Sequence, residues 1–293
     1  MGRALADTYP EAREVFAEAD AALGESLSGL CFDGPEDRLT LTENTQPAIL
    51  TASIAAYRVL HARGVEPAFV AGHSLGEYSA NVAAGTMAFA DAVRIVRRRG
   101  RYMQEAVPVG EGAMAAILGL DAAQVAQVCA AAAGGEVVSP ANINGAGQVV
   151  IAGARGAVAR ASERAKAAGA KRAIPLAVSA PFHCALMKPA EERLAPELRA
   201  LAVHDPRVPV VANVDAVPKR TGRDAIEALV RQVSAPVRWE DVMRRLASEG
   251  VTAYVEVGPG TVLSGLARKI HKEATVVSFD TPDGLDAVLA LAR

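Results

Sequence analysis

The segment Gly72-His73-Ser74-Leu75-Gly76 is the strongest chemical signal in the sequence. It has the pattern G-x-S-x-G, and it lies between a short apolar run and a stretch rich in small residues. Between a strand and a helix this pattern is typical of a sharp turn that exposes a nucleophilic serine. The N–H of Leu75, at the start of the helix, could then stabilise the oxyanion that forms when Ser74 attacks a thioester carbonyl. The other interpretation is a glycine-lined turn with an incidental serine.

One arginine lies on the apolar side of the helix predicted from Phe89 to about Ala106. At 100° per residue, Arg99 falls in the middle of a stripe made by Ala92, Ile95, Val96 and Met103. A guanidinium that points inward is costly unless it meets an anion. That anion is either an internal carboxylate or a carboxylate of the substrate, and the internal pair is the more frequent case. The remaining arginines predict a solvated face with some attraction for acidic partners: Arg94, Arg97, Arg98 and Arg101.

A serine nucleophile needs a proton acceptor, which is normally histidine. The sequence offers five of them: His61, His73, His183, His204 and His271. His183 follows a predicted strand and a proline, and α/β enzymes place catalytic groups on loops just past strand ends. The pattern alone does not choose among the five.

The composition indicates a globular protein and gives little indication of partners. The chain has 293 residues, of which 51% are hydrophobic and 22% charged, with a formal net charge of -2. We therefore expect no global attraction for nucleic acid or membrane, and we find neither a signal segment nor a run of about 18 apolar residues. Three widely spaced cysteines without metal-ligand spacing favour a reducing cytoplasm. We expect a cytoplasmic monomer without a metal site.

Alternating helices and short apolar strands must position these groups. Helices are predicted over 10–24, 46–63, 75–84, 89–106, 190–202, 224–233 and 240–249, and strands over 68–71, 208–211, 253–257 and 276–279. This alternation predicts an α/β fold with a mostly parallel sheet.

The pattern changes near Pro108. It becomes strand-helix-strand twice over, with strands at 114–118, 137–140, 148–152 and 171–178 and helices at 122–133 and 154–168. That order is the signature of a ferredoxin-like α+β unit. We therefore divide the chain into a large catalytic α/β subdomain, residues 1–107 and 176–293, and a ferredoxin-like insert, residues 108–175.

Several segments together resemble the bacterial malonyl-CoA:acyl carrier protein transacylases, and the resemblance covers nearly the whole chain. They are Gln46-Pro47-Ala48-Ile49-Leu50-Thr51-Ala52-Ser53, Ala71-Gly72-His73-Ser74-Leu75-Gly76-Glu77-Tyr78-Ser79-Ala80, Arg99-Gly100-Arg101-Tyr102-Met103-Gln104, Ser179-Ala180-Pro181-Phe182-His183, Pro236-Val237-Arg238-Trp239 and Glu256-Val257-Gly258-Pro259-Gly260. Their order and joint presence make the resemblance far more specific than G-x-S-x-G alone.

The resemblance implies a two-step acyl transfer in fatty acid synthesis. Malonyl-CoA acylates Ser74, and the phosphopantetheine thiol of acyl carrier protein then takes the malonyl group, with no metal or redox cofactor. His183 would be the base and acid, and Arg99 would bind the malonyl carboxylate. Three other residues match positions of the family's cleft. The segment at Gln232 would supply a backbone carbonyl that orients the histidine, and Asn142 and Asn144 would line the cleft.

The start of the sequence departs from the family pattern. The family opens with an apolar strand and a Phe-Pro-Gly-Gln-Gly-Ser-Gln loop, whereas Met1-Gly2-Arg3-Ala4-Leu5 resembles the stretch after that loop. In the family the loop supplies a second oxyanion-hole N–H, and losing one such donor costs on the order of 10²–10³ in rate. We therefore expect the chain as written to be weakly active or inactive, and a form that carries the strand and loop to be active.

Two other functions stay open. A serine thioesterase or another hydrolase would share the serine turn but would not need a carboxylate on its substrate. A non-catalytic carrier-binding protein would need neither the nucleophile nor the missing loop.

Overall fold

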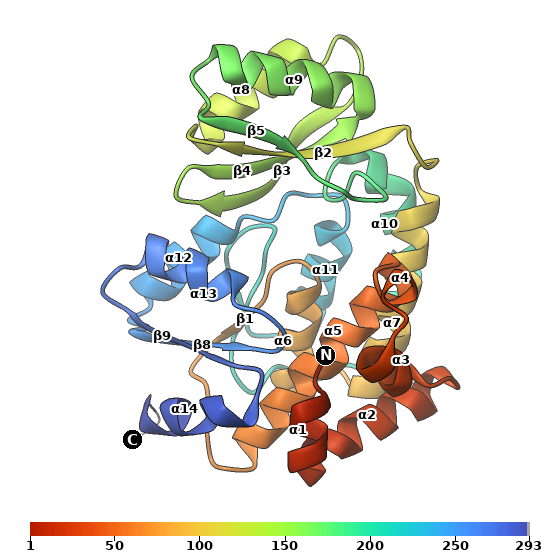
Figure 1. Cartoon of the computed structure of the whole chain (residues 1–293), viewed down its shortest axis with the longest axis vertical. Coiled ribbons are helices and arrows are strands. Elements are labelled where there is room, and N and C mark those ends of the chain that lie inside the picture. Colours follow the sequence, from red (N-terminus) through yellow and green to blue (C-terminus); the bar gives the residue numbers. More distant parts are fainter. Residues whose placement is uncertain (292–293) are drawn as a thin grey trace.

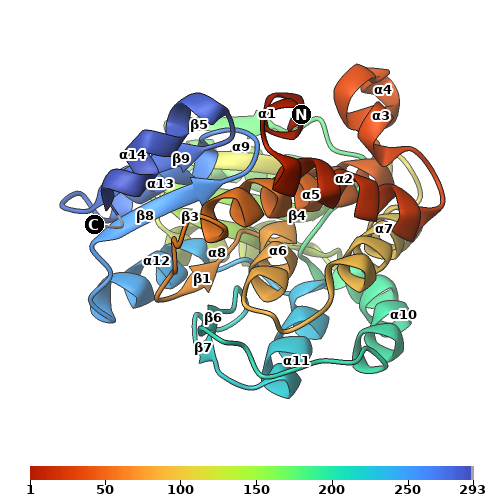
Figure 2. The same cartoon turned by 90° about the horizontal axis from the view of Figure 1, so that it is seen from below.

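The first third of the chain consists mainly of helices packed around one long apolar helix. The computed structural model describes residues 1–291. Its first helices are α1 (Arg3–Thr8), α2 (Pro10–Leu23), α3 (Leu27–Asp33), α4 (Glu36–Leu39), α5 (Thr42–His61), α6 (Leu75–Ala83) and α7 (Phe89–Glu105). Helix α5 packs against α2, α6 and α7, and from below it lies between α2 and α6 (Figure 2). This burial explains why the middle of α5 is free of charge.

The strands of the larger part form two small sheets. Strand β1 (Val70–Ala71) is parallel to β6 (Val210–Val211), which is antiparallel to β7 (Pro218–Lys219). Strands β8 (Ala253–Val257) and β9 (Thr275–Phe279) form a separate parallel pair. The chain is therefore α/β, but the expectation of one mostly parallel sheet is wrong for residues 1–291, where no hydrogen-bonded strand joins the two sheets. With only two residues, β1 offers few ladder bonds, so helices hold the turn that follows it.

Five further helices complete the larger part. They are α10 (Lys188–Arg199), α11 (Gly222–Gln232), α12 (Trp239–Ser248), α13 (Val262–Ile270) and α14 (Leu285–Leu291). Helix α10 packs against α7 and α11, and α13 packs against α12 and both strands of the β8–β9 pair. Among residues 1–291, no helix combines the length and apolar character that a membrane span requires.

Residues 112–175 form a unit of their own at the top of Figure 1. The elements are β2 (Gly112–Leu118), α8 (Ala122–Ala132), β3 (Val138–Gly145), β4 (Gln148–Ala154), α9 (Arg155–Ala167) and β5 (Arg172–Pro175). The strands are antiparallel in the order β3-β4-β2-β5, and the two helices pack on one face of the sheet. The order of elements is that of the ferredoxin-like motif. The other face packs against the segment that follows β5, including Phe182 and Cys184.

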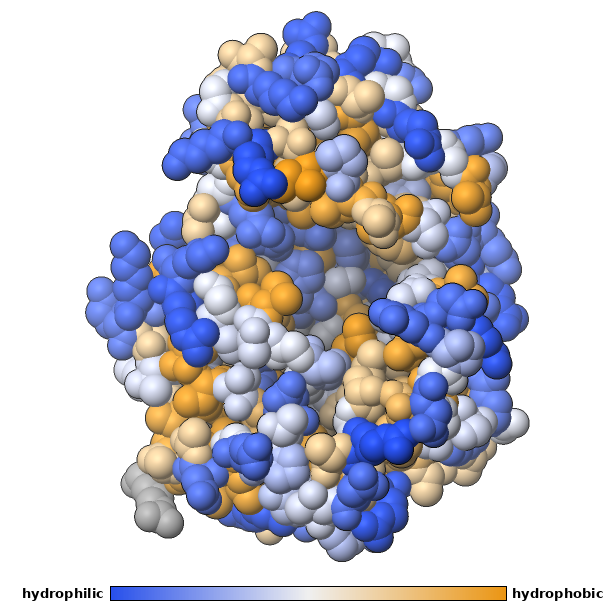
Figure 3. Space-filling model, viewed as in Figure 1, coloured by the Kyte–Doolittle hydropathy of each residue, from blue (hydrophilic) through white to orange (hydrophobic). Residues whose placement is uncertain are grey.

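This unit is joined to the larger part by backbone hydrogen bonds. Val237, in the segment between α11 and α12, donates its N–H to Ala141 at 2.8 Å and accepts the N–H of Ile143 at 2.8 Å. The segment thus continues the edge of the unit's sheet beside β3. Below the sheet the surface is hollowed (Figure 3), and the predicted site residues lie where the two parts of the molecule meet.

Candidate active site

Ser74 lies on the turn between β1 and α6 with a backbone that residues with a Cβ rarely adopt. Its φ is 52° and its ψ is −105°. Such a conformation costs of order 1–3 kcal/mol and persists only where the surroundings fix it. A Cβ on Gly72 would lie 2.1 Å from the carbonyl carbon of Gly76, so only glycine fits at position 72. Gly76 itself has room for a Cβ, so the close approach of the backbone requires glycine at position 72 but not at position 76.

His183 is in hydrogen-bond contact with the Ser74 hydroxyl. The Ser74 Oγ lies 2.6 Å from Nε2 of the ring, and Nδ1 lies 2.9 Å from the carbonyl oxygen of Gln232. Because a carbonyl only accepts, Nδ1 is the donor, and Nε2 is free to accept the serine proton. Burial and, next, the charge of Arg99 lower the pKa of His183 to about 3, so the ring is neutral at physiological pH.

Arg99 extends from α7 to the same hydroxyl and is 2% exposed. Its Nη2 donates to Ser74 Oγ and to the side-chain oxygen of Gln232, both at 3.0 Å, and its Nη1 donates to the side-chain oxygen of Gln46 at 2.7 Å. All three acceptors are neutral, and Nε has no partner. Within residues 1–291 no carboxylate forms an ion pair with this guanidinium, so the internal ion pair, one of the two readings of the sequence, is not present.

The insert reaches the turn through Asn144. The side-chain oxygen of Asn144 lies 2.9 Å from Nε2 of His73, whose ring lies against Trp239 at 5.6 Å between centroids. Asn142, also on β3, has a buried side-chain oxygen without a hydrogen-bond partner. Leu75 is the first residue of α6, so its N–H is one of the helix's free N-terminal donors.

The whole chain is similar to known proteins. A family model described as "Acyl transferase domain" matches residues 1–287. The chain belongs to this family. A malonyl CoA-acyl carrier protein transacylase of Escherichia coli K12 is 55% identical over 289 residues, which cover 98% of this chain and 93% of the relative.

Two solved structures extend the likeness of this acyl transferase to the whole fold. An acyl carrier protein S-malonyltransferase from Vibrio cholerae is 49% identical with a TM-score of 0.96, covering 98% of this chain and 94% of that one. A malonyl-transacylase solved in complex with its type II polyketide synthase acyl-carrier protein is 46% identical with a TM-score of 0.96, over 98% and 94% of the two chains.

The structure brings three residues to the site to which the sequence analysis gave no role. Gln46 holds the Arg99 guanidinium, Asn213 accepts the Ser74 N–H at 2.7 Å, and Glu77 lies one turn beyond Ser74 in α6. Two of them left a signal in the sequence. Asn213 follows strand β6, at the sheet edge where α/β proteins gather functional groups, and Glu77 is an acidic residue in a helix with few charges.

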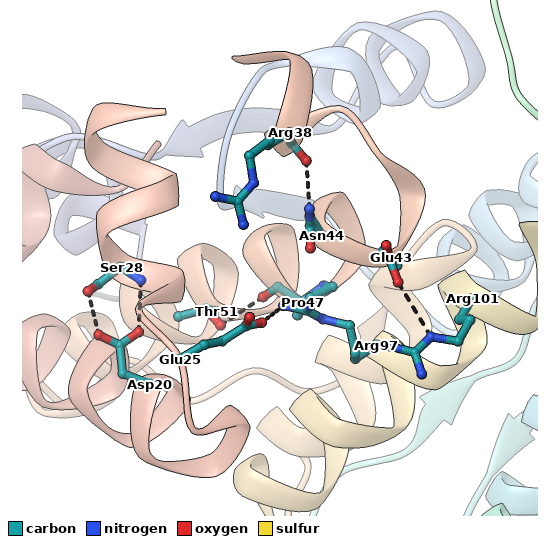
Figure 4. Close-up of polar contacts among 10 residues, drawn as sticks. All are labelled: Asp20, Glu25, Ser28, Arg38, Glu43, Asn44, Pro47, Thr51, Arg97 and Arg101. Atoms are coloured by element: carbon teal, nitrogen blue, oxygen red, sulfur yellow. Dashed lines mark hydrogen bonds and ion pairs between the residues drawn. The ribbon is translucent and has the colours of Figure 1, made fainter. Parts of the chain in front are cut away.

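The outer arginines of α7 are not free for a partner. Each forms an ion pair with a carboxylate nearby, as Figure 4 shows for Arg97 with Glu25 and Arg101 with Glu43. The other two pairs are Arg94–Asp91 and Arg98–Glu197. The side chain of Arg97 is only 16% exposed. The expectation that this face attracts an acidic carrier therefore loses its support. Residues 1–291 hold no cluster of three or more His, Cys, Asp or Glu side chains suited to a metal ion.

Proposed function

We propose that this acyl transferase moves a malonyl group from malonyl-CoA to the phosphopantetheine thiol of acyl carrier protein, in fatty acid synthesis. The names of its relatives support the reaction. The observation that carries the specificity is the buried Arg99 guanidinium, which meets only neutral acceptors and lies 3.0 Å from the Ser74 hydroxyl. A malonyl carboxylate would supply the missing anion and place the thioester carbonyl beside Oγ.

The transfer takes two steps with His183 as base and acid. In the first step Ser74 Oγ attacks the thioester carbon, Nε2 of His183 takes the serine proton, and the N–H of Leu75 faces the oxyanion. The carbon–sulfur bond then breaks, and the departing CoA sulfur takes the proton from His183. In the second step the carrier thiol gives its proton to His183 and attacks the malonyl ester, and the proton returns to Ser74 Oγ.

Arg99 links substrate choice to the strength of the base. Its positive charge is one cause of the low pKa of His183. A bound malonyl carboxylate offsets that charge, so the pKa of His183 rises and the ring becomes a stronger base when the correct substrate is present. An uncharged acyl group leaves the base weak. Selection of the malonyl group therefore acts on the chemical step as well as on binding.

The remaining assignments follow from this mechanism. Ser74 is the nucleophile of a serine elbow, and the Gln232 carbonyl orients His183 in place of a carboxylate. Residues 1–107 and 176–293 form the catalytic subdomain, and the ferredoxin-like insert, 108–175, lines the cleft with Asn142 and Asn144. No cofactor beyond the two substrates takes part. A cytoplasmic location agrees with three free, buried cysteines.

Intact-mass analysis after brief exposure to malonyl-CoA tests the proposal. We expect a malonyl adduct on the wild-type chain and none on Ser74→Ala. The free phosphopantetheine thiol of acyl carrier protein should then remove the malonyl group from the wild-type chain. An adduct that water removes as fast without carrier would indicate a thioesterase. No adduct at all, even in a form that carries the family's N-terminal strand and loop, would favour the carrier-binding protein.

A further inference from the structure

The side chain of Asn213 holds the backbone on both sides of the turn. It is fully buried, its Oδ1 accepts the N–H of Ser74 at 2.7 Å, and its Nδ2 donates to the carbonyl oxygen of Gly72 at 2.8 Å. The amide thus pairs with two peptide groups that a neighbouring strand would otherwise bind. Because the N–H of Ser74 is occupied, the N–H of Leu75 is the donor left at this turn for an oxyanion.

Glu77 closes a ring of hydrogen bonds around the nucleophile. It is 1% exposed, and its Oε2 accepts the backbone N–H of Asn213 at 2.9 Å. The same oxygen accepts Nε2 of Gln232 at 2.8 Å, and the second N–H of that amide donates to the carbonyl oxygen of Ser74 at 2.8 Å. The N–H of Glu77 donates back to that carbonyl at 3.1 Å, inside α6. The nucleophile is therefore tied to two elements besides its own helix.

This arrangement is expensive for a purely structural contact. The backbone of Ser74 is strained, and a carboxylate buried without a cation in hydrogen-bond contact has lost its hydration. An apolar side chain at position 77 would fill the space without that cost. The ring instead fixes the position of Oγ relative to Nε2 of His183, and a displacement of about 1 Å there can cost roughly 10²-fold in rate.

We propose that Asn213 and Glu77 form a clamp whose task is to hold Ser74 in line with His183 and Arg99. Both are positioning residues, since neither touches the reacting atoms. The inference rests on the proposed function, in which Ser74 is the acylated residue. It implies that loss of the clamp slows attack by Ser74 and leaves the Arg99 contact with the malonyl carboxylate intact.

Two pairs of variants test the clamp. Asn213→Leu and Glu77→Leu remove its hydrogen bonds at similar volume, whereas Asn213→Asp keeps the acceptor for Ser74 N–H and Glu77→Gln keeps an oxygen for both donors. We expect malonyl-Ser74 to form about 10²-fold more slowly in both leucine variants, with KM for malonyl-CoA within about threefold of wild type. Glu77→Gln should recover most of the rate, whereas Asn213→Asp should recover only part of it, because its carboxylate cannot donate to the Gly72 carbonyl oxygen. The double leucine variant should be no slower than the slower single one, because both changes break one ring.

Asn44→Leu is the matched control. Asn44 is a buried asparagine whose Nδ2 donates to the Arg38 carbonyl oxygen at 2.7 Å, a backbone group outside the clamp (Figure 4). We expect it to lower the melting temperature without slowing acylation. Acylation at the wild-type rate in folded Asn213→Leu, with a melting temperature lowered as in the control, would show that Asn213 is only structural. If Asn213→Leu does not fold, an acylation rate of Glu77→Gln as low as that of Glu77→Leu would overturn the clamp. Absence of a wild-type adduct on Ser74 would overturn the proposed function instead.

Discussion

Helix α7 carries arginines on two faces, and the guanidinium groups of the two faces have different kinds of partner. On the outer face, Arg98 donates to Glu197 at 2.6 Å with half of its side chain exposed. On the inner face, Arg99 is buried, lies over the ring of Tyr78 at 5.3 Å, and donates hydrogen bonds to amide and hydroxyl oxygens. An exposed pair contributes about 0–1 kcal/mol to stability, whereas a buried guanidinium without an anion is costly. The outer charges are matched within the chain, and the inner charge stays available for a substrate.

Removal of each arginine should have effects of very different size. We expect Arg99→Ala to lower kcat/KM for malonyl-CoA by about 10²–10⁴, since two charge-assisted hydrogen bonds of about 1.5–3 kcal/mol each are lost. Acetyl-CoA should be affected far less, because it carries no free carboxylate. Arg98→Ala should change both rates by less than about twofold. Steady-state transfer with both thioesters measures this, and an unchanged malonyl preference in Arg99→Ala would remove the arginine from the mechanism.

The carboxylates beside the two faces should respond to pH with opposite sign. Burial raises the pKa of Glu77 from 4.5 to about 7, against hydrogen bonds from Gln232 and Asn213 that lower it. Glu197 is also partly buried, but hydrogen bonds from Tyr102 and Arg98 bring its pKa below the ordinary value. The contribution of Glu77 to stability is therefore present below pH 4.5 and lost as the pH rises through 7. The contribution of Glu197 is present above pH 4.5 and lost as the pH falls.

Denaturant unfolding from pH 4.5 to 8.5 measures these signs. Relative to Glu77→Gln, the wild type should lose about 3 kcal/mol of unfolding free energy as the pH rises, from a shift of roughly 2.5 pKa units at 1.36 kcal/mol each. Glu197→Gln should show a small difference that grows as the pH rises above 4.5. A wild type that gains stability over Glu77→Gln with rising pH would mean that Glu77 is well solvated or directly paired.

The residues around the inner face of α7 also show which parts of the site can be predicted from the sequence alone. Ser74 and Arg99 were found because each breaks a local rule, a serine between glycines after a strand and a charge in an apolar stripe. The roles of Gln46, Glu77 and Asn213 depend on tertiary contacts between α5, α6, α7 and the loop after β6. The position of Asn213 after a strand and the isolated charge of Glu77 mark these two residues in the sequence but do not show what they contact. The short helices α1, α3 and α4 have too few turns to show a periodicity. The pairing partners of the strands also could not be predicted from the sequence.

The insert contacts the turn that carries Ser74 through a hydrogen bond between Asn144 and His73. Asn144→Ala leaves Nε2 of the half-buried His73 without its partner at 2.9 Å. We expect the unfolding free energy to fall by about 1 kcal/mol, and malonyl-CoA turnover to fall several-fold because the residue next to the nucleophile is loosened. Denaturant unfolding and steady-state kinetics measure the two effects. Asn44→Ala loses one hydrogen bond of similar length to a carbonyl oxygen outside the turn, so equal loss of turnover in both variants would contradict this interpretation.

The smallest effect is expected from Arg101, on the outer face that the sequence predicts to attract acidic partners. Arg101 lies 3.5 Å from Glu43 with more than half of its side chain exposed. Because the pair neutralises itself, Arg101→Ala should change KM for carrier protein by less than about twofold, and Arg101→Ala combined with Glu43→Ala should not differ from it. Transfer assays at low and high salt measure both values. A several-fold rise in KM for the carrier alone, strongest at low salt, would mean that the carrier's acidic groups displace Glu43 and that the two faces of α7 serve the same reaction.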